Sequence, residues 1–575
     1  MERIHLTIDG QEIAVPKGTT ILKAAREAGV EIPTLCYLEG IHEIGACRVC
    51  VVEVKGAKTL LPSCITQVSE GMEVIIHSPR VRRARKSIIN LLLSDHPEDC
   101  LSCGKAGRCE LQEMARNLGI RDNPYVGEHS RQYYDESTPS IIRDSSKCIL
   151  CGRYLSVCSQ VQGVNAIAPI GRGFKTTISP AYRDELSEVS CVLCGQCTIV
   201  CPTGALMERR YTEEVWKALE DKDLHTVIQV APAIRASIGE EFGMVPGTIV
   251  TGKLVTALKR MGFDKVFDTV FTADLTIVEE GHELLDRMEK GGKLPMITSC
   301  SPGWIKFIEH QYPDLLDHVS TCKSPQQMFG AIMKTYYAEK MGVDPKRIFT
   351  VSVMPCTAKK FEASRPEMGR DGYRDVDAVL TTRELADMLR EACIDFNSLE
   401  DQPFDNPFDQ GSGAGVIFGN TGGVMEAALR TVYELVTGQE LPGLSMKAIR
   451  GLEGAKDAQV SLGDSEVRVA AAHGLSNVRI LLEDIKEGRS PYQFIEIMCC
   501  PGGCIGGGGQ PIPTNDEIRR ARIEGLYRED EELAVRKSHE NPVVQELYED
   551  FLGEPLGELS HRLLHTHYTP RYTPK

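Results

Sequence analysis

The stretch "EIMCCPGGCIGGGG", residues 496–509, places three cysteines within six positions and surrounds them with glycine. Glycine loses more backbone entropy on ordering than any other residue, so such a segment does not hold a fixed shape unaided. Something else in the folded protein must compensate for ordering it. What that is depends on the rest of the chain.

The composition of the 575-residue chain is that of a globular protein with several domains. A net charge of −16 argues against nucleic acid or an anionic membrane as the main partner. The N-terminus "MERIHLTIDG" lacks a signal-peptide core, and no run approaches about 18 apolar residues, so a cytoplasmic location is expected. Because thiols stay reduced there, the 21 cysteines are interpreted as metal ligands rather than disulfides.

The sequence predicts a multidomain fold that passes from α+β to α/β. Alternating apolar residues around a "DG" turn, followed by the helical "TILKAAREAG", predict a β-grasp domain over residues 1–78. A small helical domain is expected over 79–127, and 139–209 holds two related stretches, "CILCGRYLSVC" and "CVLCGQCTIVCP". Over 210–575, short strands such as "HTVIQVAPA", "RIFTVSVMPC" and "GAGVIFG" alternate with helices, which predicts a large α/β domain.

The first domain carries the spacing C-x10-C-x2-C-x13-C, in which Gly45 lets backbone amides turn toward sulfur. This pattern predicts a 2Fe-2S cluster; structural zinc is the alternative, and the β-grasp frame disfavours it. The candidate ligands are Cys36, Cys47, Cys50 and Cys64.

The second domain offers one imidazole and three thiols with the spacing H-x3-C-x2-C-x5-C. Such a set suits either zinc or a 4Fe-4S cluster, and its place between two iron–sulfur modules favours the cluster. The candidate ligands are His96, Cys100, Cys103 and Cys109.

The third domain resembles bacterial ferredoxins with two 4Fe-4S clusters, in which the last cysteine of each run binds the other cluster. That pairing gives one complete set of ligands: Cys158, Cys191, Cys194 and Cys197. The other set, Cys148, Cys151 and Cys201, lacks a fourth cysteine because Tyr154 stands in its place. This site could hold a three-iron cluster, could take a phenolate or water ligand, or could be missing.

Residues 1–209 are therefore interpreted as an electron wire. The same modules occur in the large iron–sulfur subunit of respiratory complex I and in formate dehydrogenases, so the wire alone does not define an activity.

Three short motifs in the C-terminal domain indicate what the wire serves: "TSCSPGW" (298–304), "MPCTAKKFE" (354–362) and "EIMCCPGGCIGGGGQP" (496–511). They resemble the signature motifs of FeFe hydrogenases, TSCCPxW, MPCxxKxxE and ExMxCxxGCxxGG. The segments "SPQQ" (324–327) and "FGNTGGVMEAALR" (418–430) match as well, and the order of the N-terminal modules resembles that of large monomeric clostridial enzymes.

The resemblance implies an H-cluster, a 4Fe-4S cubane joined through a cysteine sulfur to a two-iron unit with CO, cyanide and azadithiolate ligands. Cys356, Cys500 and Cys504 match three cubane ligands, with Cys504 as the bridging sulfur. The glycines would let the backbone approach the cofactor, and metal bonding would compensate for ordering the loop. Cys499 matches no role in the family and is assigned to packing.

Other positions match the family's pocket. Lys359 is expected to hydrogen-bond a cyanide. The remaining matches form apolar or pocket-lining walls: Ala231, Pro232, Pro325, Gln326, Met354, Phe418 and Met498.

A proton path is also implied, through Glu280, Glu283, Arg287 and Ser320 to Cys300. The spacings of three and four residues place the two glutamates and the arginine on one helix face. A thiol suits the last step because its unperturbed pKa, about 8.5, lies near working pH.

One position departs from the family. The motif has two adjacent cysteines, the first relaying protons and the second binding the cubane, whereas this chain has Cys300 and then Ser301. Either Ser301 is the ligand and Cys300 keeps its relay role, or the loop shifts and Cys300 is the ligand, or the active site is weakened. The first alternative is preferred here, although an alkoxide is a harder ligand than a thiolate.

The expected function is reversible reduction of protons to hydrogen, with electrons from or to ferredoxin. One alternative is the hydrogenase subunit of an electron-bifurcating complex, whose partner subunits would supply flavin and NADH sites. A different class is a hydrogen sensor or electron carrier with weakened catalysis, which Tyr154 and Ser301 favour. In each case, dedicated maturation proteins would build the diiron unit.

Overall fold

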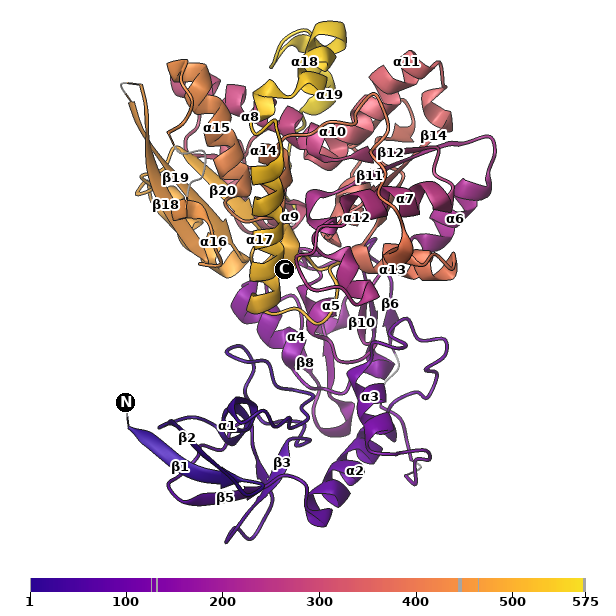
Figure 1. Cartoon of the computed structure of the whole chain (residues 1–575), viewed down its shortest axis with the longest axis vertical. Coiled ribbons are helices and arrows are strands. Elements are labelled where there is room, and N and C mark those ends of the chain that lie inside the picture. Colours follow the sequence, from indigo (N-terminus) through magenta and orange to yellow (C-terminus); the bar gives the residue numbers. More distant parts are fainter. Residues whose placement is uncertain (1, 126, 131–132, 443–446, 464, 572–575) are drawn as a thin grey trace.

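The computed structural model describes residues 2–125, 127–130, 133–442, 447–463 and 465–571. Figure 1 shows N-terminal modules of strands and short helices below a much larger C-terminal region of helices and sheets. The first module and helix α2 lie side by side at the lower end of the molecule, and the segments with α4 and α5 lie between them and the large C-terminal region (Figure 1).

The N-terminal module is a five-stranded sheet with the order β2-β1-β5-β3-β4. Its first hairpin turns at Asp9 and Gly10, both at positive φ, a conformation that matches the twist of paired strands. Helix α1 (Ile21–Glu27) falls within the predicted helical stretch and buries its apolar residues in the core of the module. The strands are β1 (Arg3–Ile8), β2 (Gln11–Pro16), β3 (Val51–Val54), β4 (Leu61–Pro62) and β5 (Met72–Ile75).

Helices α2 (Pro79–Leu93) and α3 (Glu110–Asn117) come next and contact each other, with a cysteine-bearing segment between them. Short strands follow: β6 (Tyr134–Asp135), β7 (Ile141–Asp144), β8 (Ala168–Ile170), β9 (Thr177–Ser179) and β10 (Leu206–Glu208).

Two short helices, α4 (Arg153–Ser156) and α5 (Gln196–Val200), each follow a cysteine loop in this region. Each helix starts after a left-handed glycine, Gly152 or Gly195, with φ of 81° and 70°. This shared geometry agrees with the internal repeat in the sequence.

The large domain contains two four-stranded sheets. One is all parallel, with the order β12-β11-β14-β17, and the other has the order β13-β20-β19-β18. The first comprises β11 (His225–Val230), β12 (Lys265–Asp268), β14 (Ile348–Val353) and β17 (Ala378–Leu380). The second comprises β13 (Met296–Ile297), β18 (Ala455–Leu462), β19 (Ser465–His473) and β20 (Phe494–Met498). A separate hairpin pairs β15 (Gly369–Arg370) with β16 (Tyr373–Arg374).

Helices cover these sheets and fill the space between them, and Figure 1 shows α17 running down the middle of the domain. The helices are α6 (Thr212–Glu220), α7 (Thr251–Met261), α8 (Val270–Lys290), α9 (Pro302–Gln311), α10 (Pro325–Ile332), α11 (Ala338–Met341), α12 (Ala358–Ala363), α13 (Thr382–Glu391), α14 (Gly413–Val416), α15 (Gly423–Thr437), α16 (Leu475–Lys486), α17 (Asp516–Glu532), α18 (Pro542–Leu547) and α19 (Glu558–Leu564).

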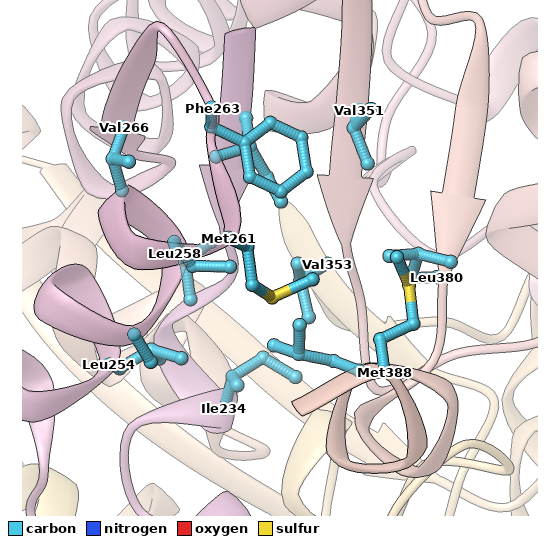
Figure 2. Packing of buried hydrophobic residues seen from close by; sticks show 14 of the residues in the cluster. Ile234, Leu254, Leu258, Met261, Phe263, Val266, Val351, Val353, Leu380 and Met388 are labelled. Atoms are coloured by element: carbon cyan, nitrogen blue, oxygen red, sulfur yellow. The ribbon is translucent and has the colours of Figure 1, made fainter. Parts of the chain in front are cut away.

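The parallel sheet is held by a hydrophobic cluster on one of its faces. Figure 2 shows Leu254 and Leu258 of α7 packed toward Val353 of β14, with Met388 of α13 below Leu380 of β17. Burying each of these side chains contributes about 1.5–3 kcal/mol, so the cluster anchors the strands whose ends carry the site.

The prediction of a strand at "GAGVIFG" is wrong. Residues 413–416 form helix α14, and a 3-10 turn follows over Ile417–Gly419. The Ser412 hydroxyl accepts a hydrogen bond from the Gly415 amide and caps the helix. A side chain at Gly413 or Gly415 would collide with Asp530 or Val270, so these glycines serve close helix packing.

Candidate functional site

Four strands from the two sheets end at one place. Ala231 follows β11, Cys300 follows β13, Cys356 follows β14 and Cys500 follows β20. Ligand sites form beyond the carboxyl ends of strands, where side chains from several strands can point into one space. Here the strand ends enclose a cavity of about 70 Å³.

The cavity gathers most of the residues predicted for the catalytic centre. All seven predicted wall residues line it: Ala231, Pro232, Pro325, Gln326, Met354, Phe418 and Met498. Lys359 and five of the predicted hydroxyl and thiol residues line it as well: Cys300, Ser301, Cys356, Cys500 and Cys504. Segments more than 270 residues apart in the chain thus meet at one site, as the motifs predict.

The donor set fits an iron–sulfur group. Cys356, Cys500 and Cys504 surround a buried space whose other walls are mainly apolar, and thiolates are the ligands that such clusters use. The buried Gln326 Oε1 atom has no hydrogen-bond partner among the described residues, which leaves one polar acceptor in the wall. The volume exceeds that of a single water, so a compact group can enter.

The glycines of the opening stretch serve close approach between backbones. A Cβ atom at Gly503 would lie 2.6 Å from the Thr421 amide nitrogen, and one at Gly507 would lie 2.1 Å from the Pro355 carbonyl oxygen. At Gly508 it would lie 2.3 Å from the Cys194 carbonyl oxygen. The glycine-rich loop therefore packs against the backbone of the cysteine loop in the ferredoxin-like region at distances as short as those within its own domain.

The predicted proton path is hydrogen-bonded from Arg287 through Glu283 to Ser320, on α8 and the segment before α10. Neither carboxyl oxygen of Glu280 has a hydrogen-bond partner among the described residues. Arg287 Nη2 donates to Glu283 Oε1 over 2.6 Å, and the Ser320 hydroxyl donates to Glu283 Oε2 over 2.8 Å. The Ser320 hydroxyl also lies near the Glu280 carboxyl, but its proton is directed to Glu283. Glu280 is 1% exposed and lies close enough to Cys300 for its charge to act on that thiol.

The electrostatics keep the inner end of this path protonated. Burial, with the neighbouring Glu283 charge, raises the pKa of Glu280 to about 8. Burial and the Glu280 charge also raise the pKa of the Cys300 thiol well above its ordinary value. Near neutral pH both groups therefore hold a proton, so the thiol pKa lies further from working pH than the sequence suggests.

Lys359 of α12 is fixed by two polar contacts. Its Nζ atom donates to the Cys300 carbonyl oxygen over 3.0 Å and to Glu362 Oε2 over 2.9 Å. Glu362 also accepts from the Ser324 hydroxyl and from Gln326 Nε2. The Glu362 carboxylate balances the positive charge of the Lys359 ammonium group. Because an ammonium group has three N–H donors, one remains for a group in the cavity.

Cys300 and Ser301 point in different directions. The Cys300 side chain packs with the cluster that contains Phe418 and Met498. The Ser301 hydroxyl instead accepts a hydrogen bond from the Cys499 amide over 3.2 Å, at the start of α9.

The ferredoxin-like region forms two groups of thiols. The four cysteines of the first predicted set, Cys158, Cys191, Cys194 and Cys197, line a second cavity of about 40 Å³. Cys194 also lines the cavity at the strand ends, so the two cavities share a wall.

In the second set, Cys201 lies near Cys148 and Cys151 and raises the pKa of both, secondary to their burial. The Tyr154 hydroxyl is 3.0 Å from Cys148 Sγ. The phenol therefore lies beside the three thiols, at the place of the missing cysteine.

The N-terminal thiols also gather. The Cys47 amide donates to Cys36 Sγ over 3.5 Å, as the turn at Gly45 predicts, and the sulfurs of Cys50 and Cys64 are 3.4 Å apart. A histidine links this module to the ferredoxin-like region, since His42 Nε2 is 2.9 Å from the Cys151 carbonyl oxygen.

In the helical domain, Cys100 and Cys103 both lie close enough to Cys109 to raise its pKa, after burial. The buried Nδ1 atom of His96 has no partner among the described residues, which suits a ligand. A side chain at Gly204 would meet Cys103 Sγ at 2.8 Å, so this thiol also abuts the ferredoxin-like region.

Two buried glutamates were missed as site residues. Glu362 ends the quoted "MPCTAKKFE" motif and orients Lys359. Glu496 opens the glycine-rich stretch, and its carboxylate accepts from the Gly422 and Met425 amides at the start of α15. A charged residue inside an otherwise apolar strand was the signal for Glu496, and burial raises its pKa to about 7.

Among the described residues, no helix combines the length and the apolar character that a membrane span requires.

Family models match most of the chain. The C-terminal domain of the iron-only hydrogenase large subunit matches residues 224–508, and the iron hydrogenase small subunit matches 516–571. A 2Fe-2S iron–sulfur cluster binding domain matches 1–79, and a 4Fe-4S binding domain matches 186–207. The iron–sulfur binding region of NADH-ubiquinone oxidoreductase-G matches 85–124. The predicted 2Fe-2S and 4Fe-4S modules are thereby confirmed in kind.

Whole proteins are similar as well. The NADP-reducing hydrogenase subunit HndD of Solidesulfovibrio fructosivorans is 52% identical over 99% of this chain and 100% of its own length. Iron hydrogenase 1 of Clostridium pasteurianum is 42% identical over 98% of this chain and 99% of its own. A structure of a variant of apo FeFe hydrogenase HydA1 from Chlamydomonas reinhardtii, 44% identical, covers 63% of this chain and 99% of that chain with a TM-score of 0.58. The chain therefore belongs to the iron-only (FeFe) hydrogenase family, as an enzyme with accessory iron–sulfur domains.

Proposed function

We propose that the hydrogenase reaction of this chain takes place in the thiol-lined cavity, with protons delivered through Glu283, Ser320, Glu280 and Cys300. Two protons and two electrons give one hydrogen molecule, and the reverse reaction returns them. The observation that carries this proposal is a line of titratable side chains that leads from Arg287 to a cavity lined by cysteines.

An H-cluster bound in the cavity would supply the metal centre at which protons and electrons combine. Cys356, Cys500 and Cys504 would hold its cubane. Lys359, neutralised by Glu362, would direct its free N–H toward a diatomic ligand.

The side chains of the path define how protons move. A proton that reaches Glu283 is passed on when the Ser320 hydroxyl turns, accepts it and gives its own proton to Glu280. Glu280 is protonated near neutral pH and can re-protonate the Cys300 thiol. Arg287 holds Glu283 in place through Nη2, which also donates to the Val319 carbonyl oxygen.

Electrons would travel through four accessory sites. The 2Fe-2S site would use Cys36, Cys47, Cys50 and Cys64, and the helical domain would use His96, Cys100, Cys103 and Cys109. The site nearest the cavity would use Cys158, Cys191, Cys194 and Cys197, and the remaining site Cys148, Cys151 and Cys201. The shared wall at Cys194 supports the order of the last step.

The test is hydrogen evolution from reduced viologen by the fully loaded chain, compared with Cys300→Ala. We expect loss of about 100-fold or more in turnover, because a general acid is removed, with the iron content unchanged. Cys393→Ala, which removes an exposed thiol elsewhere, serves as the control. Full turnover in Cys300→Ala would exclude this path.

For the electron partner, we propose flavin-bearing subunits that exchange electrons with a nicotinamide nucleotide, with ferredoxin as the alternative. The relative that is 52% identical over its whole length is named as a subunit of an NADP-reducing hydrogenase. Purification under anaerobic conditions should then yield a complex that evolves hydrogen from NADPH or NADH. A chain that purifies alone and accepts electrons only from ferredoxin would favour the alternative.

A further inference from the structure

Ser301 stands where the family motif has a cysteine that binds the cubane, and the described residues around it include another thiol. The Cys499 amide donates to the Ser301 hydroxyl, so the two positions are neighbours although they are 198 residues apart. Both line the same cavity, together with Cys356, Cys500 and Cys504.

The Cys499 sulfur lies against the first turn of α9, the helix that Ser301 precedes. A Cβ atom at Gly303 would lie 2.8 Å from Cys499 Sγ, so only glycine at position 303 leaves room for this sulfur. The Cys499 sulfur therefore lies beside the start of the helix that Ser301 precedes.

The contacts of Cys499 do not fix it as an ordinary buried thiol. It is 4% exposed, and its sulfur is 3.8 Å from the Gln162 amide oxygen, a long contact for a weak donor. Its sulfur also lies beside those of Cys194 and Cys500. Thiols gathered in this way are typical of a cluster site rather than of a core.

The chemistry of iron ligands favours Cys499 over Ser301 as the fourth ligand of the cubane. Cubane iron in proteins is held by thiolates, whereas a serine must lose a far less acidic proton and then presents a hard oxygen. Cys300 is left for the proton path, since its side chain packs beside Phe418 and Met498 and lies close to Glu280.

We propose that Cys499 supplies the fourth thiolate of the cubane, in place of Ser301, so that the ligands are Cys356, Cys499, Cys500 and Cys504. Ser301 then positions this ligand by accepting its amide hydrogen. The inference rests on the proposed function in one respect, that the cavity holds a cubane. It also puts a cubane ligand next to Cys194, so the last electron step would run between two neighbouring sulfurs.

The test uses the full chain reconstituted with iron and sulfide, without the diiron unit. Iron and sulfide are counted per chain, and EPR spectra and reduction potentials are recorded against the wild type. Cys499→Ala should lose about four irons and four sulfides, whereas Ser301→Ala and Cys300→Ala should keep them. The double variant Cys499→Ala/Ser301→Cys should regain them, because it returns a thiol to the neighbouring position.

Cys499→Ser separates loss of a ligand from a folding defect, because serine nearly preserves the volume of the side chain. A ligand role predicts an altered EPR signal and reduction potential of one cluster in this variant, and a packing role predicts neither. Full iron in Cys499→Ala with loss in Ser301→Ala, or an unchanged spectrum in Cys499→Ser, would overturn the proposal. Absence of the cubane from the wild type would instead contradict the proposed function, and none of these readouts depends on hydrogen turnover.

Discussion

Glu280 is the residue on which the proposed proton path most directly depends, because it lies between the Glu283–Ser320 pair and Cys300. Glu280→Gln keeps the shape but cannot exchange a proton. We expect hydrogen evolution to fall about 100-fold or more, with cluster content unchanged.

Glu279→Gln is the matched control for this variant. Glu279 is also buried on α8, but it is bound by Tyr548 and His565 rather than by the path. The Glu279→Gln substitution should lower the melting temperature, while turnover per folded chain stays close to that of the wild type. Equal loss of turnover in both variants would contradict the assignment of Glu280.

The raised pKa of Glu280 also has a consequence for pH dependence. Its folded value of about 8 lies above the ordinary 4.5, so between these values the folded protein holds a proton that the unfolded chain has lost. This residue's contribution to the free energy of unfolding therefore falls as pH rises from about 4.5 to about 8. Urea unfolding of wild type and Glu280→Gln at several pH values isolates the effect, and identical pH dependence in both would refute it.

At the scale of elements, the short helix α12 holds two adjacent lysines with different tasks. Lys359 pairs with Glu362 at the cavity, and Lys360 pairs with Glu384 at the start of α13. Breaking a buried pair costs about 3–5 kcal/mol. We expect Glu384→Gln to lower stability by an amount of this order while turnover per folded chain is retained, because glutamine can preserve the cap of α13.

Glu362→Gln should reduce turnover as well as stability, because Lys359 then loses the carboxylate that orients it beside the Cys300 carbonyl. Denaturant titration and hydrogen evolution, measured on the same preparations, separate the two effects. A Glu362→Gln variant that loses stability alone would assign Lys359 to the scaffold.

Helix α4 carries the unusual residue of the wire, Tyr154. Its hydroxyl lies beside Cys148 Sγ, so we expect a hydrogen bond to that sulfur rather than a bond to iron. Tyr154→Phe should then leave the iron content unchanged, and Tyr154→Cys should raise it by about one iron as a three-iron cluster becomes a 4Fe-4S cluster. EPR of the oxidised protein distinguishes the two states, and loss of the cluster in Tyr154→Phe would show that the phenolate is a ligand.

At the scale of the whole molecule, the sequence predicts which side chains meet better than it predicts how they are held. The motifs identify the cavity residues because metal ligation permits only a few residue types, which recur at short, fixed spacings in the sequence. The roles of Glu362 and Cys499 depend on contacts with segments remote in the chain, which no local pattern encodes. The prediction of a strand at "GAGVIFG" was wrong for a similar reason. Its glycines allow close packing against α8 and α17, which are remote in the sequence, and they do not belong to a sheet.

The modular arrangement predicts that hydrogen chemistry and electron supply can be separated. Cys197 lines the cavity of the accessory cluster site proposed nearest the catalytic cavity but does not line the catalytic cavity itself. Cys197→Ala should therefore abolish electron transfer to an external acceptor, since a required ligand of the wire is lost, while the catalytic cavity keeps its residues. Exchange between deuterium gas and water needs protons and the catalytic site but no external electrons, so this activity should persist. Cys393→Ala, at an exposed thiol, should retain both activities. Loss of exchange in Cys197→Ala, with the cubane still detected by EPR, would show that the wire and the catalytic site act as one unit.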